Sequence, residues 1–194
     1  MKRDSQQVIN DLIDSAIKVI ARDGFDKATT RNIASECGLA DAYIYQYFKD
    51  KDELIVKAFD KMDNHLSLSI REIISNLFDS ALNNEQRCCI IFSHCWKLFG
   101  ETPDACRFYL QYLYSPYFYK YSRERHSEIW QKYVEDMSQL FSIQDNARTI
   151  IIFALNATLT LALKSIEEGK MNDEETERAS FNAIYGVVKP YLKD

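Results

Sequence analysis

Apolar residues recur along most of the chain at the three- and four-residue spacing that places side chains on one face of a helix. The first such segment has six of them: Ile9, Leu12, Ile13, Ala16, Ile17 and Ile20. Ser5 is its predicted N-cap and Gly24 its C-terminal stop. Alternation of apolar and polar residues with period two is absent, and the pattern therefore predicts an all-α protein.

Short helices are predicted next, from Thr29 or Thr30 to Cys37 and over about 41–48. A further helix begins at Asp50, where Asp50 and Glu53 have the spacing of a capping box. Longer helical segments follow over about 51–64, 66–82, 85–99, 103–115, 120–141, 145–168 and 173–192. Among their boundaries, Thr102 with Pro103 predicts a start, Gly169 an end, and Asn172 with Glu175 the cap of the last helix.

The domain organisation predicted from this pattern is a small N-terminal domain over 1–50 and a larger helical domain over 51–194. No repeat and no flexible linker separates them, so we expect a continuous helix near residues 50–64 to be shared.

The stretch 24–54 has the order of a helix-turn-helix, with Gly38 at the reversal between two short helices. Ile33, Ala34 and Leu39 are expected to face inward, as are Ile44 and Phe48 of the second helix. The opposite face of that helix is small, polar and aromatic, as suits the major groove of DNA. An ordinary solvated helical corner is the alternative interpretation.

The net charge of −5 excludes a protein that coats nucleic acid without specificity, but it permits a local DNA-reading face. Residues 1–54 contain eight basic and ten acidic side chains, a balance of −2. A basic surface for DNA must therefore come from where the lysines and arginines lie, and not from the net charge of this segment.

This stretch resembles the N-terminal domain of the TetR/AcrR family of bacterial transcriptional regulators. The family's order is a Gly-aromatic pair, Thr, Ile-Ala, Gly-apolar, Tyr-x-x-Phe, Lys and Leu. Those places hold Gly24-Phe25, Thr29, Ile33-Ala34, Gly38-Leu39, Tyr45, Phe48, Lys51 and Leu54. The resemblance implies a three-helix DNA-binding domain and a larger domain for ligand binding and dimerisation. It further implies no catalysis, and a homodimeric repressor that leaves a palindromic operator when a small hydrophobic or aromatic effector binds.

By position, the resemblance implies that Tyr45, Tyr47 and Lys51 hold phosphates. It also implies that the second helix begins at Thr29 and Thr30, next to the DNA backbone. The residues expected to approach bases are Arg31, Ala42, Tyr43 and Gln46, and Asp41 on the same helix is counted among the DNA-binding residues. The chain departs from the family where Ala40 replaces a common capping Ser, Asp41 a frequent Lys, Ala42 a Gly and Tyr47 a His. Asp41 has two interpretations, a helix cap in place of Ala40 or an acceptor for cytosine N4.

Thirteen of the 25 aromatic residues fall between residues 92 and 133. The tyrosine hydroxyls among them need partners if buried, which favours a partly hydrated pocket over a dry aromatic core. A planar apolar or cationic effector suits such a pocket. The predicted effector-binding residues are Phe92, Trp96, Phe99, Phe108, Tyr109, Tyr112, Trp130 and Tyr133.

The last two long segments, 145–168 and 173–192, carry small and apolar residues on more than one face. In the family that the chain resembles, the last two helices form the dimer interface. We therefore expect a homodimer, with a plain intramolecular core as the alternative.

The five cysteines show no metal-ligand spacing, so no metal, cofactor or disulfide framework is predicted. No apolar run reaches the length of a membrane span, and the N-terminal segment lacks the apolar core of an export signal, so a cytoplasmic protein is expected. Three alternatives stay open. They are a helical enzyme using His94, Cys95 and His126, a regulator that senses oxidation at Cys88, Cys89 or Cys37, and a helical module without affinity for DNA.

Overall fold

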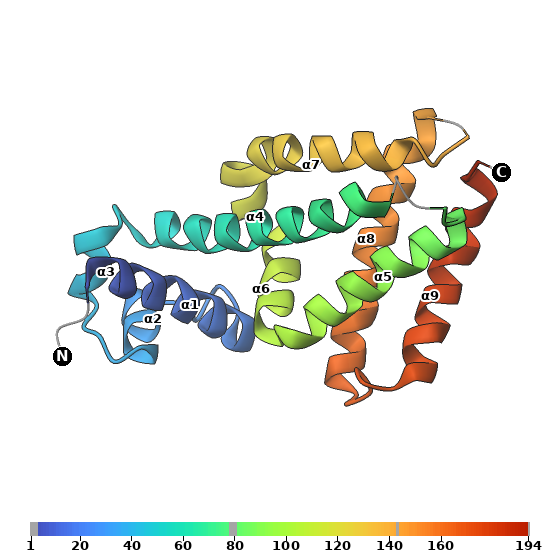
Figure 1. Cartoon of the computed structure of the whole chain (residues 1–194). Coiled ribbons are helices and arrows are strands. Elements are labelled where there is room, and N and C mark those ends of the chain that lie inside the picture. The colour runs from blue at the N-terminus through green and yellow to red at the C-terminus, as the bar shows by residue number, and fades with distance from the viewer. Residues whose placement is uncertain (1–3, 78–80, 143, 194) are drawn as a thin grey trace. The chain divides into compact units, whose positions relative to one another are not determined.

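The computed structural model describes residues 4–77, 81–142 and 144–193, and helices account for most of them (Figure 1). In chain order the elements are α1 (Ser5–Asp23), α2 (Thr30–Glu36), α3 (Ala42–Tyr47), α4 (Lys51–Leu77), α5 (Asn84–Glu101), α6 (Pro103–Leu113), the π-helix η1 (Phe118–Ser122), α7 (Arg123–Ser138), α8 (Gln144–Glu167), α9 (Glu174–Val188) and the 3-10 helix η2 (Lys189–Tyr191). The described residues form no strand, and Phe141 and Leu192 make an isolated antiparallel bridge. The all-α prediction is confirmed.

The chain folds into two compact units. Residues 1–64 and 104–124 form the first unit, and residues 65–103 and 125–194 form the second. The first unit thus extends past the predicted boundary at residue 50 and includes α6 and η1. Helix α4 continues without a break through residue 64, as the expectation of a shared helix required.

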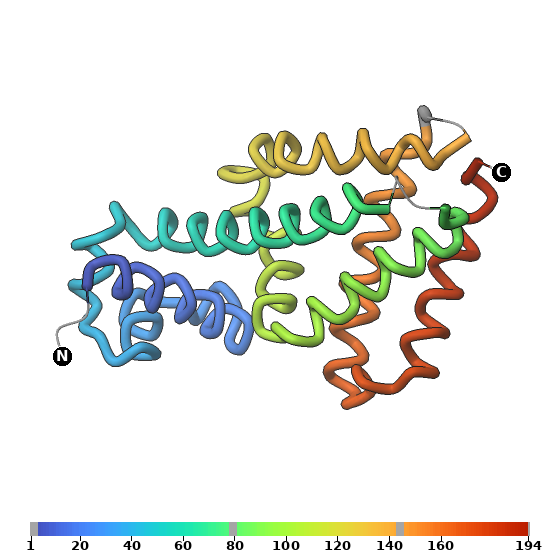
Figure 2. The backbone as a smooth tube through the Cα atoms, in the orientation of Figure 1, coloured from blue at the N-terminus to red at the C-terminus, as the bar shows by residue number. Residues whose placement is uncertain are grey.

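The core of the first unit joins the apolar faces of its N-terminal helices, which the tube in Figure 2 shows folded on one another. Leu12, Ala16 and Ile20 of α1 are fully buried, as are Ile33 of α2 and Ile44 of α3. Burial of each large apolar side chain contributes about 1.5–3 kcal/mol, so these contacts fix the arrangement of three helices that are too short to be stable alone.

Side-chain caps define several helix starts. Half of the capping box predicted at α4 is present, because Asp50 Oδ1 accepts from the Glu53 amide at 2.9 Å, but Glu53 Oε2 accepts from the Lys49 amide at 2.7 Å and not from that of Asp50. Two predicted caps are wrong by one residue. Asp4 replaces Ser5 at α1, accepting from the Gln7 amide.

At α9, Asp173 replaces Asn172 as the cap and accepts from the amide of Thr176 at 2.9 Å. In both corrected cases a carboxylate next to the predicted residue takes the bond. A carboxylate makes a stronger, charge-assisted bond to the helix amides and also interacts favourably with the helix dipole.

The predicted break between segments 51–64 and 66–82 is wrong, since α4 is a single helix of 27 residues. Asp63 and Asn64 have low helix propensity, but their side chains find partners that leave the helix intact. Asp63 accepts a hydrogen bond from Tyr109, and Asn64 donates to the Asp60 carbonyl. The later part of the predicted segment, residues 78–80, lies outside the described residues.

In the second unit, α5, α8 and α9 pack against one another (Figure 1). No uninterrupted apolar run reaches the length of a membrane span, but one helix of the described residues has the length and overall composition of one. Residues 146–167 of α8 have a mean hydropathy of 1.7 and the length to cross a membrane, and only 28% of the apolar window is buried. Threonines and asparagines interrupt its apolar runs, which is why counting uninterrupted runs missed it. Length and composition also fit a helix that associates with another protein surface.

Candidate DNA-binding and effector sites

The turn between α2 and α3 is set by Gly38, whose φ of 70° is a conformation that residues with a side chain rarely adopt. The Gly38 amide donates to the Ser35 carbonyl at 3.1 Å, and the Leu39 amide donates to the Ala34 carbonyl at 2.9 Å. These bonds close the last turn of α2 and redirect the chain within four residues. The helix-turn-helix predicted from the sequence is therefore present.

Helix α3 turns one face inward and the other to solvent. Ile44 is fully buried and Phe48 is 6% exposed, as predicted. The opposite face brings together Asp41, Ala42, Tyr43, Tyr45 and Gln46, all exposed, while Tyr47 is half-buried. Tyr45 is 62% exposed, so its ring and hydroxyl are available to a binding partner.

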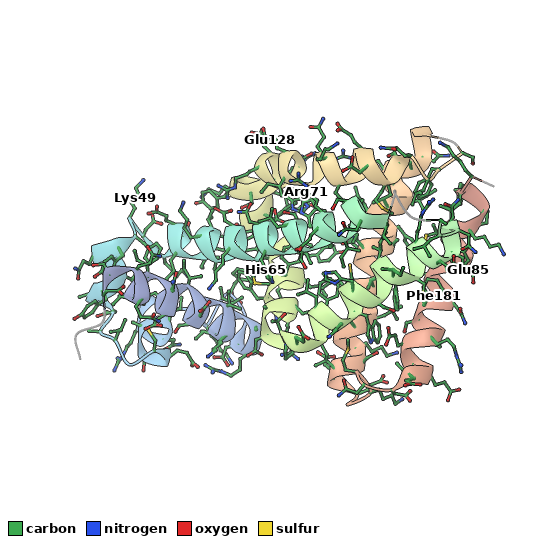
Figure 3. All side chains as sticks on the ribbon, in the orientation of Figure 1. Lys49, His65, Arg71, Glu85, Glu128 and Phe181 are labelled. Carbon is green, nitrogen blue, oxygen red and sulfur yellow. The ribbon has the colours of Figure 1, made fainter. Side chains whose placement is uncertain are left out.

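Basic and hydroxyl side chains flank this face. Thr29 caps α2, its Oγ1 accepting from the Asn32 amide at 3.2 Å, and Arg31 is exposed beside it. Lys51 begins α4, and the neighbouring Lys49 side chain extends away from the ribbon (Figure 3). The structure thus gathers in the first unit all ten residues predicted to contact DNA.

The predicted capping role of Asp41 is wrong. Asp41 occupies the position before α3, but its side chain makes no capping hydrogen bond. Its backbone is already helical, with φ −60° and ψ −26°, whereas a capping side chain reaches the second or third amide from an extended backbone. The carboxylate is exposed and makes no capping bond, which leaves the cytosine interpretation as a hypothesis.

Sequence analysis missed a carboxylate at the start of α4 that binds two tyrosines. Asp52 accepts a hydrogen bond from the Tyr117 hydroxyl at 3.0 Å and another from the Tyr121 hydroxyl at 2.8 Å. Both tyrosines lie at η1, and Phe25 stacks on Tyr117 with ring centroids 5.2 Å apart. Burial raises the pKa of Tyr117 to about 12, and Asp52 adds to the shift, so the hydroxyl stays a donor at neutral pH. We call Asp52, Tyr117 and Tyr121 the α4 clamp.

The clamp adjoins an aromatic core inside the first unit. Phe59 of α4 stacks on Tyr109 and Tyr112, with ring centroids 5.2 Å and 4.2 Å apart. Tyr109 donates to Asp63 at 2.6 Å, and the Tyr112 and Ser122 hydroxyls bond at 2.8 Å. The argument that these hydroxyls favour a hydrated pocket is therefore wrong for Tyr109 and Tyr112, because protein groups satisfy both in a buried core.

The second unit encloses an apolar cavity. It lies among α5, α7, α8 and α9 and is lined by 17 described residues, none of them charged. The space between these side chains is about 610 Å³ when its opening to solvent is included, but only about 70 Å³ admits water-sized spheres. Hydroxyls of Thr158, Tyr133 and Tyr185 are the oxygen-bearing groups of its lining side chains. Such a surface favours an apolar ligand group over a charged one.

The predicted effector-binding residues are divided between the two units. Phe108, Tyr109 and Tyr112 belong to the first unit, whereas Phe92 and Tyr133 line the cavity of the second. Trp96, Phe99 and Trp130 are buried in the second unit outside the cavity lining.

The two tryptophans lie one ring away from the cavity. Trp96 stacks on Phe92 at 5.4 Å between centroids, and Trp130 meets Tyr133 edge to face at 5.3 Å. Phe92 also packs on Phe181 of α9, labelled in Figure 3, at 5.5 Å. A ligand in the cavity would therefore touch the rings that contact Trp96 and Trp130.

Two cysteines, Cys88 and Cys95, also line the cavity. Burial raises the pKa of the Cys88 thiol to about 11 and that of Cys95 to about 12. A thiol with so high a pKa holds little reactive thiolate at neutral pH, which disfavours Cys88 as an oxidation sensor. Within the described residues no group of three or more His, Cys, Asp or Glu side chains is placed to hold a metal.

Comparison with known proteins addresses both units. Residues 12–58 match the family model described as bacterial regulatory proteins, tetR family. The fatty acid metabolism regulator protein of Bacillus subtilis (strain 168) is 24% identical over 178 residues, which cover 91% of this chain and 77% of that protein. The nicotine-responsive transcriptional repressor HdnoR of Paenarthrobacter nicotinovorans is 40% identical over 68 residues, which span 35% of each chain.

Solved structures match over nearly the whole chain. A tetR family regulator from Shewanella sp. PV-4 has a TM-score of 0.77 at 15% identity, covering 96% of this chain and 99% of that one. The regulator FadR of Bacillus subtilis, solved with stearoyl-CoA, has a TM-score of 0.62 at 17% identity and covers 92% and 96%. These likenesses establish the shared fold.

The helix-turn-helix and the helical unit that follows it define a DNA-binding transcriptional regulator rather than an enzyme. Residues 12–58 carry the DNA-binding domain of the TetR family of bacterial regulatory proteins, and nearly the whole chain shares the fold of solved TetR family regulators.

Proposed function

We propose that the protein represses transcription by binding a palindromic operator as a homodimer, and that an apolar effector in the cavity of the second unit releases it. The observation that carries the DNA-binding half of this proposal is the exposed face of α3, where Tyr43, Tyr45 and Gln46 stand free of the core. Its surroundings supply the basic residues Arg31, Lys49 and Lys51. This proposal places the protein in the cytoplasm, because the DNA that it binds lies there.

On this proposal the residues divide by the part of DNA that they contact. Tyr45, Tyr47 and Lys51 hold phosphates and set the register, with the N-terminal end of α2 at Thr29 and Thr30. The base edges are approached by Arg31, Ala42, Tyr43 and Gln46, and Asp41 stands beside them on the face of α3 that meets DNA.

The homodimer is proposed to form through α8 and α9. Ile152 and Phe153 of α8 are 41% and 45% exposed, and Val187 of α9 is 47% exposed. Ala179 and Ala183 are also exposed on α9, where small side chains allow close helix approach. Pairing these faces in two copies would cover the apolar surface that α8 leaves open, and a two-fold axis suits a palindrome.

The effector class is inferred from the cavity. Its uncharged lining fits an alkyl or acyl chain, and relatives that carry the names fatty acid metabolism regulator and FadR with stearoyl-CoA support this class. A planar amine is the alternative that the name of the nicotine-responsive relative suggests. We favour the long-chain acyl compound, since none of the lining residues supplies a carboxylate for a cation.

The test measures operator affinity and effector response in one assay. Operator fragments are first selected from genomic DNA with the purified protein, and fluorescence anisotropy then follows release by stearoyl-CoA or by nicotine. We expect stearoyl-CoA to lower operator affinity and to change tryptophan fluorescence, because Trp96 and Trp130 contact cavity residues.

A variant that fills the cavity separates effector binding from DNA binding. Ala154→Trp places a large side chain in the cavity and should abolish release while operator affinity is retained. The matched control is Ile90→Trp, at an exposed position of α5 outside the lining, which should respond as the wild type does. Failure of either ligand class to alter operator binding would refute the effector half of the proposal.

A further inference from the structure

The short segment that follows α9, drawn at the C-terminal end of the tube in Figure 2, is hydrogen-bonded to two other parts of the second unit. We call residues 189–193 the C-terminal strap. The Ser142 amide and hydroxyl both donate to the Tyr191 carbonyl, at 2.9 and 3.0 Å. The Lys193 amide donates to the Leu140 carbonyl at 2.8 Å, and Asn84 Nδ2 donates to the Lys193 carbonyl at 2.8 Å. These four bonds hold the strap between α5 and the segment after α7.

The strap also forms part of the wall of the apolar cavity. Phe141 and Leu192 face each other across the antiparallel bridge, and both side chains line the cavity. Val188, the residue before the strap, lines it as well. Helices supply the rest of the wall, so the strap and the bridge are the part of the wall that few hydrogen bonds hold in place.

The cavity, although it opens to solvent, is too small in this structure for the ligand class proposed for it. About 70 Å³ admits water-sized spheres, whereas pockets for small organic ligands enclose roughly 300–1,000 Å³. A long apolar chain can therefore enter only after part of the wall has moved. Separating the strap costs a few hydrogen bonds, while separating packed helices exposes much more apolar surface.

We propose that the C-terminal strap is the lid of the effector cavity, opening at the Phe141–Leu192 bridge to admit an apolar chain. This inference rests on the proposed function in assigning the cavity to the effector. Leu192 and Phe141 are then the gate residues, and their size limits the cross-section of the chain that enters.

Native cysteines allow a test that needs no effector. Cys95 lines the cavity and is 1% exposed, so an uncharged alkylating reagent such as N-ethylmaleimide reaches it only when the cavity opens. Peptide mass spectrometry of the full-length protein measures the rate at each cysteine separately. Cys106, which is 2% exposed in the first unit, serves as the internal control because its rate reports general unfolding.

Two variants loosen the strap in different ways. Asn84→Ala removes one hydrogen bond to it and should raise the alkylation rate of Cys95 about fivefold, the factor expected for one neutral bond. Leu192→Ala removes a gate side chain and should have an effect at least as large. Lys189→Ala changes an exposed side chain of the same strap and should leave the rate unchanged.

Unchanged Cys95 rates in both loosened variants would overturn the lid, and so would an equal acceleration at Cys106. Adding stearoyl-CoA tests the proposed function separately from the lid. In the wild type it should protect Cys95 from alkylation and release the protein from the operator. Accelerated alkylation in the strap variants without any release by stearoyl-CoA would uphold the lid and reject that effector.

Discussion

Asp41 stands on the face of α3 expected to meet DNA, and its carboxylate makes no bond to the helix amides. We predict that Asp41→Asn leaves the melting temperature unchanged, since no capping bond is lost. Operator affinity should stay equal or rise, because a carboxylate beside phosphates costs affinity. Thermal unfolding and anisotropy titrations measure the two quantities. The control Asp26→Asn removes an exposed charge outside α3.

The cytosine interpretation of Asp41 makes the opposite prediction for binding. Loss of a hydrogen bond to cytosine N4 would cost about 1–3 kcal/mol, and only at operators with that base. A selective loss of this size, with an unchanged melting temperature, would assign Asp41 to base reading.

Tyr109 illustrates a residue whose partner decides its role. Its hydroxyl donates to the carboxylate of Asp63, which is 1% exposed. We predict that Tyr109→Phe lowers the free energy of unfolding by about 1.5–3 kcal/mol, the range for a hydrogen bond to a charged group. Urea denaturation measures the change. Tyr114→Phe, at a position 72% exposed, is the control and should unfold as the wild type does.

Single residues were predictable where the reason for their position is local. Gly38 adopts its positive φ within a four-residue turn, and Ile44 and Phe48 follow helical spacing. The partners of Tyr109 and Asp52 lie 46 and 65 or more residues away in sequence, and no spacing rule reaches that far. The sequence does show many tyrosines near acidic residues. It does not show which tyrosine hydroxyl bonds to which carboxylate.

At the scale of elements, the α4 clamp connects η1 to the first turn of α4, from which Lys51 is expected to reach a phosphate. We predict that Tyr121→Phe weakens operator binding about fivefold, because one hydroxyl no longer holds Asp52 in place. In an Asp52→Ala background the same change should have no further effect. Anisotropy titrations of the four proteins give the coupling.

A simple structural defect would give a different result. Loss of affinity from Tyr121→Phe that persists in the Asp52→Ala background would show that the clamp does not act through Asp52. Tyr119→Phe, in the same π-helix and 66% exposed, is the matched control and should bind the operator normally.

Helix existence was largely predictable, and helix ends less so. The bond from the Glu53 amide to Asp50 formed as predicted because both partners are close in sequence, whereas the Glu53 side chain bonds to Lys49, one residue before the predicted partner. The break expected near residue 65 did not form, since tertiary contacts of α4 outweigh weak local propensity. The π-helix at 118–122 had no sequence signal, and its irregular turn is stabilised by distant groups such as Asp52 and Tyr112.

At the scale of the whole molecule, helical class and family followed from the sequence, but the position of the cavity did not. Aromatic density predicted an effector site over residues 92–133, yet α8 and α9 supply nine of the 17 residues that line the cavity, and six of those nine are aliphatic. The sequence predicted that α8 and α9 form the dimer interface. One helix with apolar residues all round can serve both purposes, lining a cavity with one face and an interface with another.

The dimer interface is the remaining prediction at this scale. Phe153→Glu puts a charge on an exposed apolar face of α8, so it should not disturb the fold but should prevent two copies from pairing. Light scattering at micromolar concentration should find a dimer for the wild type and a monomer for the variant. Operator affinity should fall by roughly 10²–10⁴-fold, because each copy then binds its half-site without the other. Ile90→Glu on α5 introduces the same charge at a position 40% exposed and should remain dimeric with full affinity. A wild-type monomer, or a variant that stays dimeric, would place the operator-binding interface elsewhere than on Phe153.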